Sequence, residues 1–230
     1  MNNPGFIEAF IDYVSKNYMR ILTATGEHIY ISLIALAITL VTCIPLGIYL
    51  TRNEKIAPYV ISIANVFQTI PSLALLGFLI FVFGIGNDNA ICALVMYAML
   101  PVLQNTYTGI KNVDKATVQA AKGMGMTNFQ ILMKVQIPLA LPVIISGVRV
   151  ASVWIIGTAA LAAAIGGGGL GRLIFSGLSL IRDEIIFAGA LPATALALLT
   201  DMVLKKFQKY TTPEERAKRI AKKMKVNFNH

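Results

Sequence analysis

The stretch KNVDKATVQAAKGMGMTNFQILMKVQIPLAL (residues 111–141) lies between two long apolar runs and decides how the rest of the chain is interpreted. It carries four lysines, which is too much charge for a segment that stays within a bilayer. Its glycines, capping residues and apolar positions nevertheless predict two short helices. A structured polar projection on a membrane protein indicates a contact with another protein.

The composition around this insert is that of an integral membrane protein. Hydrophobic residues make up 56% of the chain, charged residues 13%, and the mean hydropathy is +0.69. A chain of 230 residues has room for five or six spans of about 20 residues, and not for a sizeable soluble domain as well.

The two cysteines, Cys43 and Cys92, lie inside apolar runs, where thiols are packing residues, so no structural disulfide is predicted.

Five apolar stretches are predicted to span the membrane, and the fold class is therefore an all-α integral membrane protein. Helices are expected because lipid requires each span to satisfy its own backbone hydrogen bonds. The predicted spans cover residues 28–50, 56–83, 89–110, 139–165 and 185–204.

Three parts of the chain are distinguished. Residues 1–27 lack the features of a signal peptide and have apolar positions at helical spacing, which predicts an amphipathic helix on the membrane surface. Residues 28–204 form the transmembrane domain and include the insert. Residues 205–230 form a tail with nine basic and two acidic residues, which accounts for most of the net charge of +9. Such a tail after a span predicts contact with anionic lipid at the cytoplasmic face, and no nucleic acid partner.

The distribution of lysine and arginine over the short loops predicts the orientation. The loop after the first span holds Arg52 and Lys55, and the insert and the tail are basic too. The positive-inside rule then places the N-terminus outside and the C-terminus and insert in the cytoplasm. All five predicted spans agree with this alternation.

Within the insert, local signals predict where each short helix begins and ends. Asp114 is a candidate N-cap, and Gly123 with Gly125 is predicted to close the first helix. Thr127 and Gln130 have the spacing of a capping box at the start of the second helix. Pro138 is expected to end that second helix before the next span.

An apolar side of the first helix is the predicted contact surface. It includes Val118, Ala121, Met124 and Met126. Alanine and methionine side chains suit a shallow, adaptable groove on a partner protein.

The spacing within the insert resembles the cytoplasmic signature of permease subunits of ATP-binding-cassette importers. That pattern reads Glu-Ala-Ala, three residues, Gly, nine residues, then Ile, any residue, Leu, Pro. Here Gln119-Ala120-Ala121 is followed by Gly125 and by Val135-Gln136-Ile137-Pro138. The two aliphatic changes are conservative. Gln119 lacks the carboxylate, so a salt bridge from this position to an ATPase is not expected.

The resemblance covers the whole layout of the chain and implies a role for the insert. In such permeases this loop is a coupling helix that fits into a cleft of a separate ATPase. The residues implied in ATPase coupling are Val118, Gln119, Ala120, Ala121, Gly123, Met124, Gly125, Met126 and Phe129.

Further stretches resemble permeases for osmoprotectants, namely the glycine betaine, carnitine and choline importers of prokaryotes. These stretches are QTIPSLALLGFLI (residues 68–80), GTAALAAAIGGGGLG (residues 157–171) and LIFSGLSL (residues 173–180). Methionine importers share the five-span layout and are the nearest alternative substrate class.

A polar stripe in the second predicted span is a candidate lining of the translocation pathway. Asn65, Gln68, Thr69 and Ser72 fall at helical spacing on one face, and a polar stripe in lipid must face protein or water. Hydrogen bonding between helices explains the stripe nearly as well. Thr158, in the glycine-rich stretch, completes the candidate set.

Several catalytic and cofactor motifs are absent or lack their context. The run GGGGLG (residues 166–171) follows a span and not a strand, so it predicts a flexible outer gate or a tight backbone crossing instead of a nucleotide site. No G-x-x-x-x-G-K-[ST] motif and no histidine cluster with metal-ligand spacing occur. Arg149 inside the fourth span is expected to have a structural role, with Asp201 as a candidate partner, and Trp154 is expected to pack.

The chain is therefore expected to be a non-catalytic transport subunit in the plasma membrane that binds no cofactor or metal itself. The expected partners are a second permease, identical or similar, two cytoplasmic ATPases that use ATP and magnesium, and an extracellular solute-binding protein. Two rivals remain open: a secondary transporter or channel that works without ATP, and a membrane scaffold whose insert recruits a soluble protein.

Overall fold

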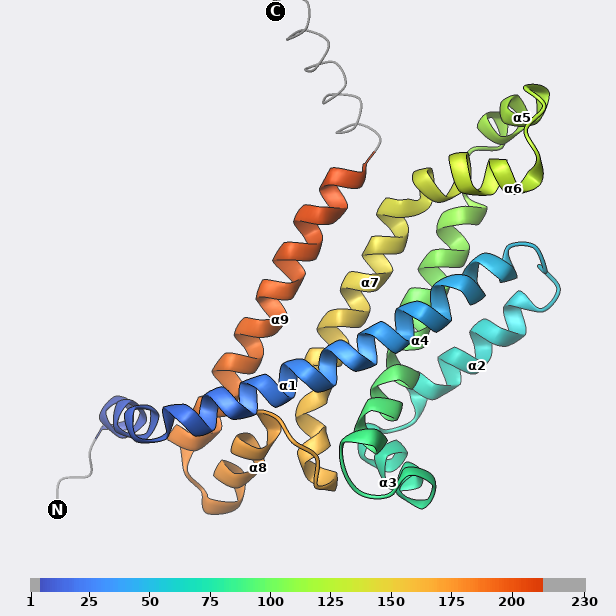
Figure 1. Ribbon diagram of the computed structural model, residues 1–230. Coiled ribbons are helices and arrows are strands. Elements are labelled where there is room, and N and C mark those ends of the chain that lie inside the picture. The colour runs from blue at the N-terminus through green and yellow to red at the C-terminus, as the bar shows by residue number, and fades with distance from the viewer. Residues whose placement is uncertain (1–4, 213–230) are drawn as a thin grey trace, which may run out of the picture.

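The computed structural model describes residues 5–212 and shows helices joined by short turns throughout that range (Figure 1). The greater part of the predicted basic tail, residues 213–230, lies outside the described residues, as do residues 1–4. The elements are α1 (Phe6–Leu50), α2 (Ala57–Thr69), α3 (Ser72–Phe83), α4 (Asn87–Lys111), α5 (Lys115–Gly123), α6 (Asn128–Ile131), a π-helical turn η1 (Leu132–Gln136), α7 (Ile137–Ala159), a 3₁₀ segment η2 (Ala160–Ile165), α8 (Gly171–Leu180) and α9 (Asp183–Thr211).

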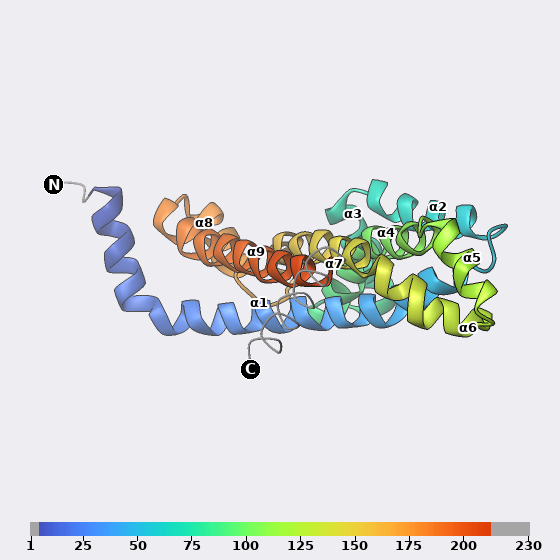
Figure 2. The ribbon, with the colours of Figure 1, turned by 90° about the horizontal axis from the view of Figure 1, so that it is seen from above.

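The helix α1 has 45 residues and runs obliquely along one side of the bundle (Figures 1 and 2). The sequence predicted a surface helix up to residue 27 and a separate first span from residue 28. In the structure α1 runs through this boundary without a break. The backbone bends instead at Asn17, whose φ and ψ of −122° and 18° are not helical, and Figure 2 shows the first turns pointing away from the remainder. The segment before the bend packs on the start of α9 through Tyr13, Ile185 and Ala188.

The second predicted span is not one helix, which corrects the prediction for residues 56–83. The helices α2 and α3 meet at an angle of 105°, and the break falls at Ile70 and Pro71. Both residues have extended ψ angles, as the residue before a proline favours. The break also separates Ser72 from Thr69, so the predicted polar stripe does not lie on one helical face.

The helix α4 lies at the centre and packs most extensively against α7 and α1. Small residues make these approaches close: a Cβ on Gly47 of α1 would lie 2.8 Å from Thr106 Cβ, and one on Gly147 of α7 would lie 2.5 Å from the Pro101 carbonyl oxygen. The main buried cluster between these helices includes Ile31, Leu103 and other aliphatic residues. Close backbone approach through glycine is the usual way for membrane helices to gain packing contacts.

The second helix of the insert does not end at Pro138, contrary to the prediction. The helix continues from α6 through η1 into α7, and Pro138 lies in the first turn of α7. In η1 the Ile137 amide donates to the Leu132 carbonyl, which is the i→i+5 pattern of a wide turn. The wide turn directly before Pro138 accommodates a residue that has no amide hydrogen to donate to the preceding turn.

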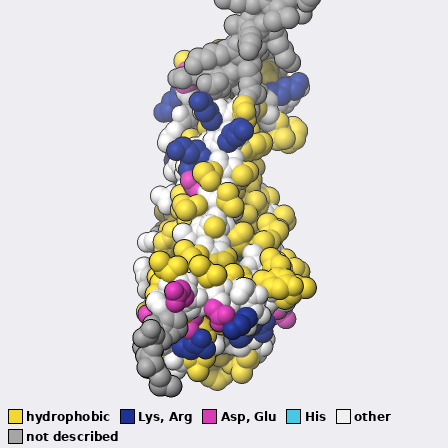
Figure 3. All heavy atoms as spheres, turned by 90° about the vertical axis from the view of Figure 1, so that its left-hand side faces the viewer, with side chains coloured by type: hydrophobic (Ala, Val, Ile, Leu, Met, Phe, Trp, Pro, Cys, Tyr) yellow, Lys and Arg dark blue, Asp and Glu magenta, His cyan; other side chains and the backbone are white. Residues whose placement is uncertain are grey.

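The face shown in Figure 3 is mainly apolar between two ends that carry charged side chains. Lysine and arginine side chains gather at the end where α9 finishes, and both signs of charge occur at the opposite end (Figure 3). Among the described residues, four helical segments are long and apolar enough to cross a membrane, and the bent pair of α2 and α3 makes a fifth. This agrees with the predicted all-α fold of about five spans.

Candidate functional site

The first helix of the insert, α5, is closed at both ends as predicted. The Asp114 carboxylate accepts hydrogen bonds from the Ala116 and Thr117 amides at 3.2 and 3.1 Å. Together with the bond from the Thr117 hydroxyl, the largest contribution, these bonds lower the pKa of the exposed Asp114 carboxyl. At the other end, Gly125 has a φ of +78°, and the Gly125 and Met126 amides donate to the Lys122 and Ala121 carbonyls, which forms a Schellman motif.

The second helix of the insert begins with the predicted capping box. The Gln130 amide donates to the Thr127 hydroxyl, and the Gln130 side chain accepts from the Thr127 amide. The turn between the two helices is therefore fixed by α5 on one side and α6 on the other. Both helices project from the end of the bundle where α4 finishes (Figure 1).

Most of the candidate coupling residues lie on the surface of this projection. Met124 and Phe129 are 75% and 71% exposed, so two large apolar side chains are offered to solvent. Gln119, Ala120, Gly123 and Gly125 are also exposed, while Val118 and Met126 are half-buried. Ala121 differs, because it is 1% exposed and packs inside the insert. It holds the fold of the projection and does not itself offer a contact surface.

Two contacts that were not predicted tie the insert to the loop after α1. Arg52 donates to the Asn128 carbonyl over 3.1 Å, and Lys111 pairs with Glu54 over 3.2 Å. The loop charges had been interpreted only as orientation signals. The partners are 76 and 57 residues apart in the sequence, so no local pattern could predict either contact.

The candidate pathway residues are not brought together as one stripe. Asn65 and Thr69 are exposed on α2. Ser72 and Thr158 line the same small space between α3, α4 and α7, whose volume of about 10 Å³ is at the lower limit for one water molecule. The described chain leaves no room for a solute there.

Gln68 makes a hydrogen bond from α2 to α4. Such bonding between helices was the alternative explanation of the polar stripe. Pro101 has no amide hydrogen, so the Tyr97 carbonyl four residues earlier lacks its helical donor. The Gln68 amide donates to this carbonyl over 2.9 Å. In return, the Tyr97 hydroxyl donates to the Ile70 carbonyl at the break between α2 and α3 over 2.6 Å. The two bonds hold the bent span against α4.

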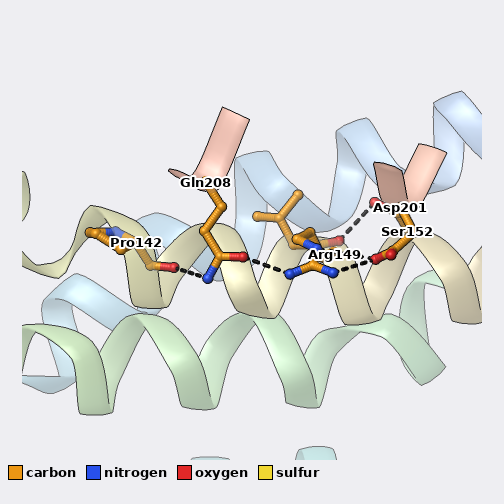
Figure 4. A network of polar contacts seen from close by, with 6 residues as sticks. Pro142, Arg149, Ser152, Asp201 and Gln208 are labelled. Atoms are coloured by element: carbon orange, nitrogen blue, oxygen red, sulfur yellow. Dashed lines mark hydrogen bonds and ion pairs between the residues drawn. The ribbon is translucent and has the colours of Figure 1, made fainter. Parts of the chain in front are cut away.

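Arg149 pairs with Asp201, as the sequence predicted (Figure 4). Its Nε and Nη2 donate to Asp201 Oδ1 over 3.1 and 2.8 Å, and its Nη1 donates to Gln208 Oε1 over 2.7 Å. Gln208 donates in turn to the Pro142 carbonyl over 2.9 Å. The guanidinium of α7 is thus satisfied by α9, which meets the requirement for a charge at membrane depth.

At the end opposite the insert, the glycine-rich loop is a tight backbone crossing. The Gly168 and Gly169 amides donate to Asn87 and Glu27, each over 2.8 Å, and Glu27 also pairs with Arg172 over 2.7 Å. A Cβ on Gly168 would lie 2.5 Å from a Glu27 oxygen. Of the two readings offered for this loop, the crossing is the one that the packing favours.

His28 lies beside Gly169 in this crossing and links α1 to α7. The sequence did not predict a structural role for it. It is fully buried, and its Nε2 donates to the Ile156 carbonyl of α7 over 2.9 Å. The described residues contain no group of three His, Cys, Asp or Glu side chains able to hold a metal ion.

The sequence that folds into this bundle and projecting insert matches a known family of membrane components. The family model described as "Binding-protein-dependent transport system inner membrane component" matches residues 43–214, which is most of the chain and includes the insert. The chain belongs to this family.

Relatives of high identity cover nearly the whole chain. The glycine betaine/carnitine/choline transport system permease protein OpuCB of Bacillus subtilis (strain 168) is 47% identical over 202 residues, which are 88% of this chain and 93% of that protein. The carnitine transport permease protein OpuCB of Listeria monocytogenes is 43% identical and covers 90% and 95%. The choline transport system permease protein OpuBB of Bacillus subtilis is 46% identical and covers 88% and 94%.

Solved structures share the fold. An inward-facing MetNI methionine ABC transporter matches with a TM-score of 0.73 and 24% identity, over 84% of this chain and 97% of that one. An amino acid ABC transporter with histidines matches with a TM-score of 0.72 and 19% identity, over 87% and 97%. At these identities the likeness concerns the fold.

Proposed function

We propose that this chain is the membrane-spanning permease subunit of an ATP-driven importer for small quaternary-ammonium osmoprotectants such as glycine betaine, carnitine and choline. The observation that carries the proposal is the identity of 43–47% to relatives named for these three compounds, over nearly the full length of each. The relatives named for methionine and other amino acids resemble this chain in fold at 24% identity or less. The alternative of a methionine permease is therefore the weaker one.

The proposed transporter contains two permeases, either identical or similar, two cytoplasmic ATPases and an extracellular solute-binding protein. A single chain with five spans has too few helices to enclose and gate a pathway, and exposed polar residues such as Asn65 and Thr69 would face the second permease. ATP and magnesium are used by the ATPase. This chain carries no catalytic group in the proposal.

The insert is the proposed docking surface for the ATPase, through Met124, Phe129 and the exposed small residues beside them. Closure of the ATPases draws the two inserts together and biases the permeases towards one of two conformations. Because Gln119 stands where the family signature has glutamate, docking depends on shape and apolar contact more than on a salt bridge. The proposed orientation places the insert and C-terminus in the cytoplasm and the N-terminus outside, in line with the basic loops.

Uptake by reconstituted transporter tests the proposal. We expect radiolabelled choline or glycine betaine to enter proteoliposomes only when the ATPase, ATP and the loaded solute-binding protein are present, and vanadate to stop it. Uptake that persists without any ATPase would favour a secondary transporter or channel. Retention of the ATPase by the permease without any transport would favour the scaffold.

A further inference from the structure

A groove between α7 and α9 is not explained by the fold or by the insert. Its volume is about 460 Å³, and its walls come from these two helices, with Arg149, Trp154, Ala197 and Asp201 among the lining residues. A separate cavity, where α1 also contributes, lies between His28, Ile155 and Leu196 and uses other faces of α7 and α9. The groove is therefore on the part of these helices that α1 does not cover.

Asp201 offers this groove a negative oxygen. Both hydrogen bonds that it receives from Arg149 end on Oδ1, which leaves Oδ2 without a bond from the guanidinium (Figure 4). The Asp201 side chain is 35% exposed, so the ion pair is not closed off by the chain. Arg149 lines the groove as well, but Nε, Nη1 and Nη2 each donate to Asp201 or Gln208, so its charge is engaged by α9.

Trp154 offers the same groove an aromatic ring. Trp154 lies within α7 and is 46% exposed. Only about half of it is therefore packed, although the sequence analysis expected a packing role. A quaternary ammonium group has no N–H to donate, and proteins bind it through aromatic faces and diffuse negative charge. Trp154 supplies one aromatic face for such a group, and Asp201 supplies a carboxylate.

Ala197 contributes a small side chain to the lining of the groove. It precedes Asp201 by four residues and so lies one turn away on the same face of α9, and it lines the same groove. A methyl side chain at this position keeps the groove open.

We propose that this groove binds the quaternary ammonium group of the cargo during translocation, with Asp201 facing its charge and Trp154 its methyl groups. This rests on the proposed function, because it takes the cargo class from there. Arg149 acts as a positioning residue that orients Asp201 and has no direct contact with the ammonium group.

The single tryptophan of the chain makes the site directly observable. When the chain is labelled with 5-fluorotryptophan and assembled with unlabelled partners in lipid nanodiscs, its one ¹⁹F resonance reports on Trp154. We expect a saturable shift of this resonance with tetramethylammonium and with choline. We expect none with 3,3-dimethyl-1-butanol, which has the shape of choline without its charge.

Three variants that keep the tryptophan locate the site. Asp201→Asn keeps an oxygen for Arg149 but removes the charge, and should weaken the apparent affinity for tetramethylammonium about tenfold, the scale of one lost charge contact in a partly desolvated site. Ala197→Leu fills the groove without touching the ion pair and should abolish the shift. Ala195→Leu makes the same change on an exposed position of α9 outside the groove and should leave the titration unchanged.

The inference would be overturned if the Trp154 resonance did not shift with either cation, or if it shifted equally with the neutral alcohol. An equal loss of the shift in Ala195→Leu and Ala197→Leu would overturn it too. Uptake by the wild-type transporter separates this failure from failure of the proposed function. If choline is transported but the Trp154 resonance does not shift, the site is refuted and the proposed function is retained. A saturable resonance without any quaternary-ammonium uptake refutes the function and supports the site.

Discussion

At the residue scale, the turn of the insert depends on one backbone conformation. Gly125 has a φ of +78°, whereas Gly123 lies in the last turn of α5 with no atom within 4 Å of an added Cβ. Gly125→Ala places a side chain in the left-handed region at a cost of about 1 kcal/mol, which loosens the Schellman turn between the two helices. We expect less ATPase retained by the permease in a pull-down, with normal amounts of permease in the membrane.

Gly123→Ala is the matched control for this change. Gly123 lies on the same exposed surface, so this variant adds the same methyl group there without a left-handed backbone conformation. Alanine favours a helix interior over glycine, so we expect the ATPase to be retained as well as by the wild type, or better. Equal losses in both variants would mean that the docking surface needs small residues at both positions, and that the turn geometry is not the cause.

Asp114 makes the first helix of the insert sensitive to acid. Folding lowers the pKa of its carboxyl, so the stabilisation by this cap is complete above the ordinary pKa of aspartate, about 3.9, and is lost as the pH falls through the lowered value. The protection factors of the Ala116 and Thr117 amides, which correct for the pH dependence of intrinsic exchange, should stay high down to that range and fall below it. Asp114→Asn, which caps without titrating, should show no such acid step. The same step in that variant would assign it to another group.

At the element scale, the bent span depends on α4. The Tyr97 hydroxyl satisfies the Ile70 carbonyl, and Tyr97 is only 6% exposed. Tyr97→Phe leaves that carbonyl without its donor, so we expect it to destabilise the protein by about 1–3 kcal/mol and to lower the thermal unfolding midpoint in detergent. Tyr59→Phe, at a position that is 73% exposed on α2, should leave the midpoint unchanged. An unchanged midpoint for Tyr97→Phe would show that the break is held by Pro71 alone.

The same elements show what the sequence could and could not predict. The caps at Asp114, Gly125 and Thr127 were predicted because their donors and acceptors lie within a few residues. The break after Ile70 was missed because its partners are 27 and 29 residues away on another helix. The π-helical turn was missed because a proline in a helical pattern predicts a stop, and the wider turn that carries the helix into Pro138 has no signal of its own. The partners that hold the break are long-range, whereas the π-helical turn is a local hydrogen-bond pattern that the sequence does not mark.

At the scale of the whole molecule, the two ends can be assigned to the two sides of the membrane. Met124 in the insert and Ile181 after α8 are 75% and 90% exposed and lie at opposite ends of the bundle. With Cys43 and Cys92 replaced by alanine and the permease produced without its ATPase, we expect a membrane-impermeant maleimide to label Ile181→Cys in intact cells, and Met124→Cys only in inverted vesicles. Labelling with the opposite sidedness would reverse the proposed orientation.

The crossing of α1 with the glycine-rich loop has a consequence for biosynthesis. His28 and Glu27 take their partners from residues 128 to 145 positions later in the chain. At roughly 5–20 residues per second, a ribosome needs on the order of ten seconds to supply those partners. During this time both polar side chains must stay hydrated, so α1 enters the bilayer with this end held at the water interface. The crossing therefore closes only when α8 emerges, and α9 packs on the bundle after it.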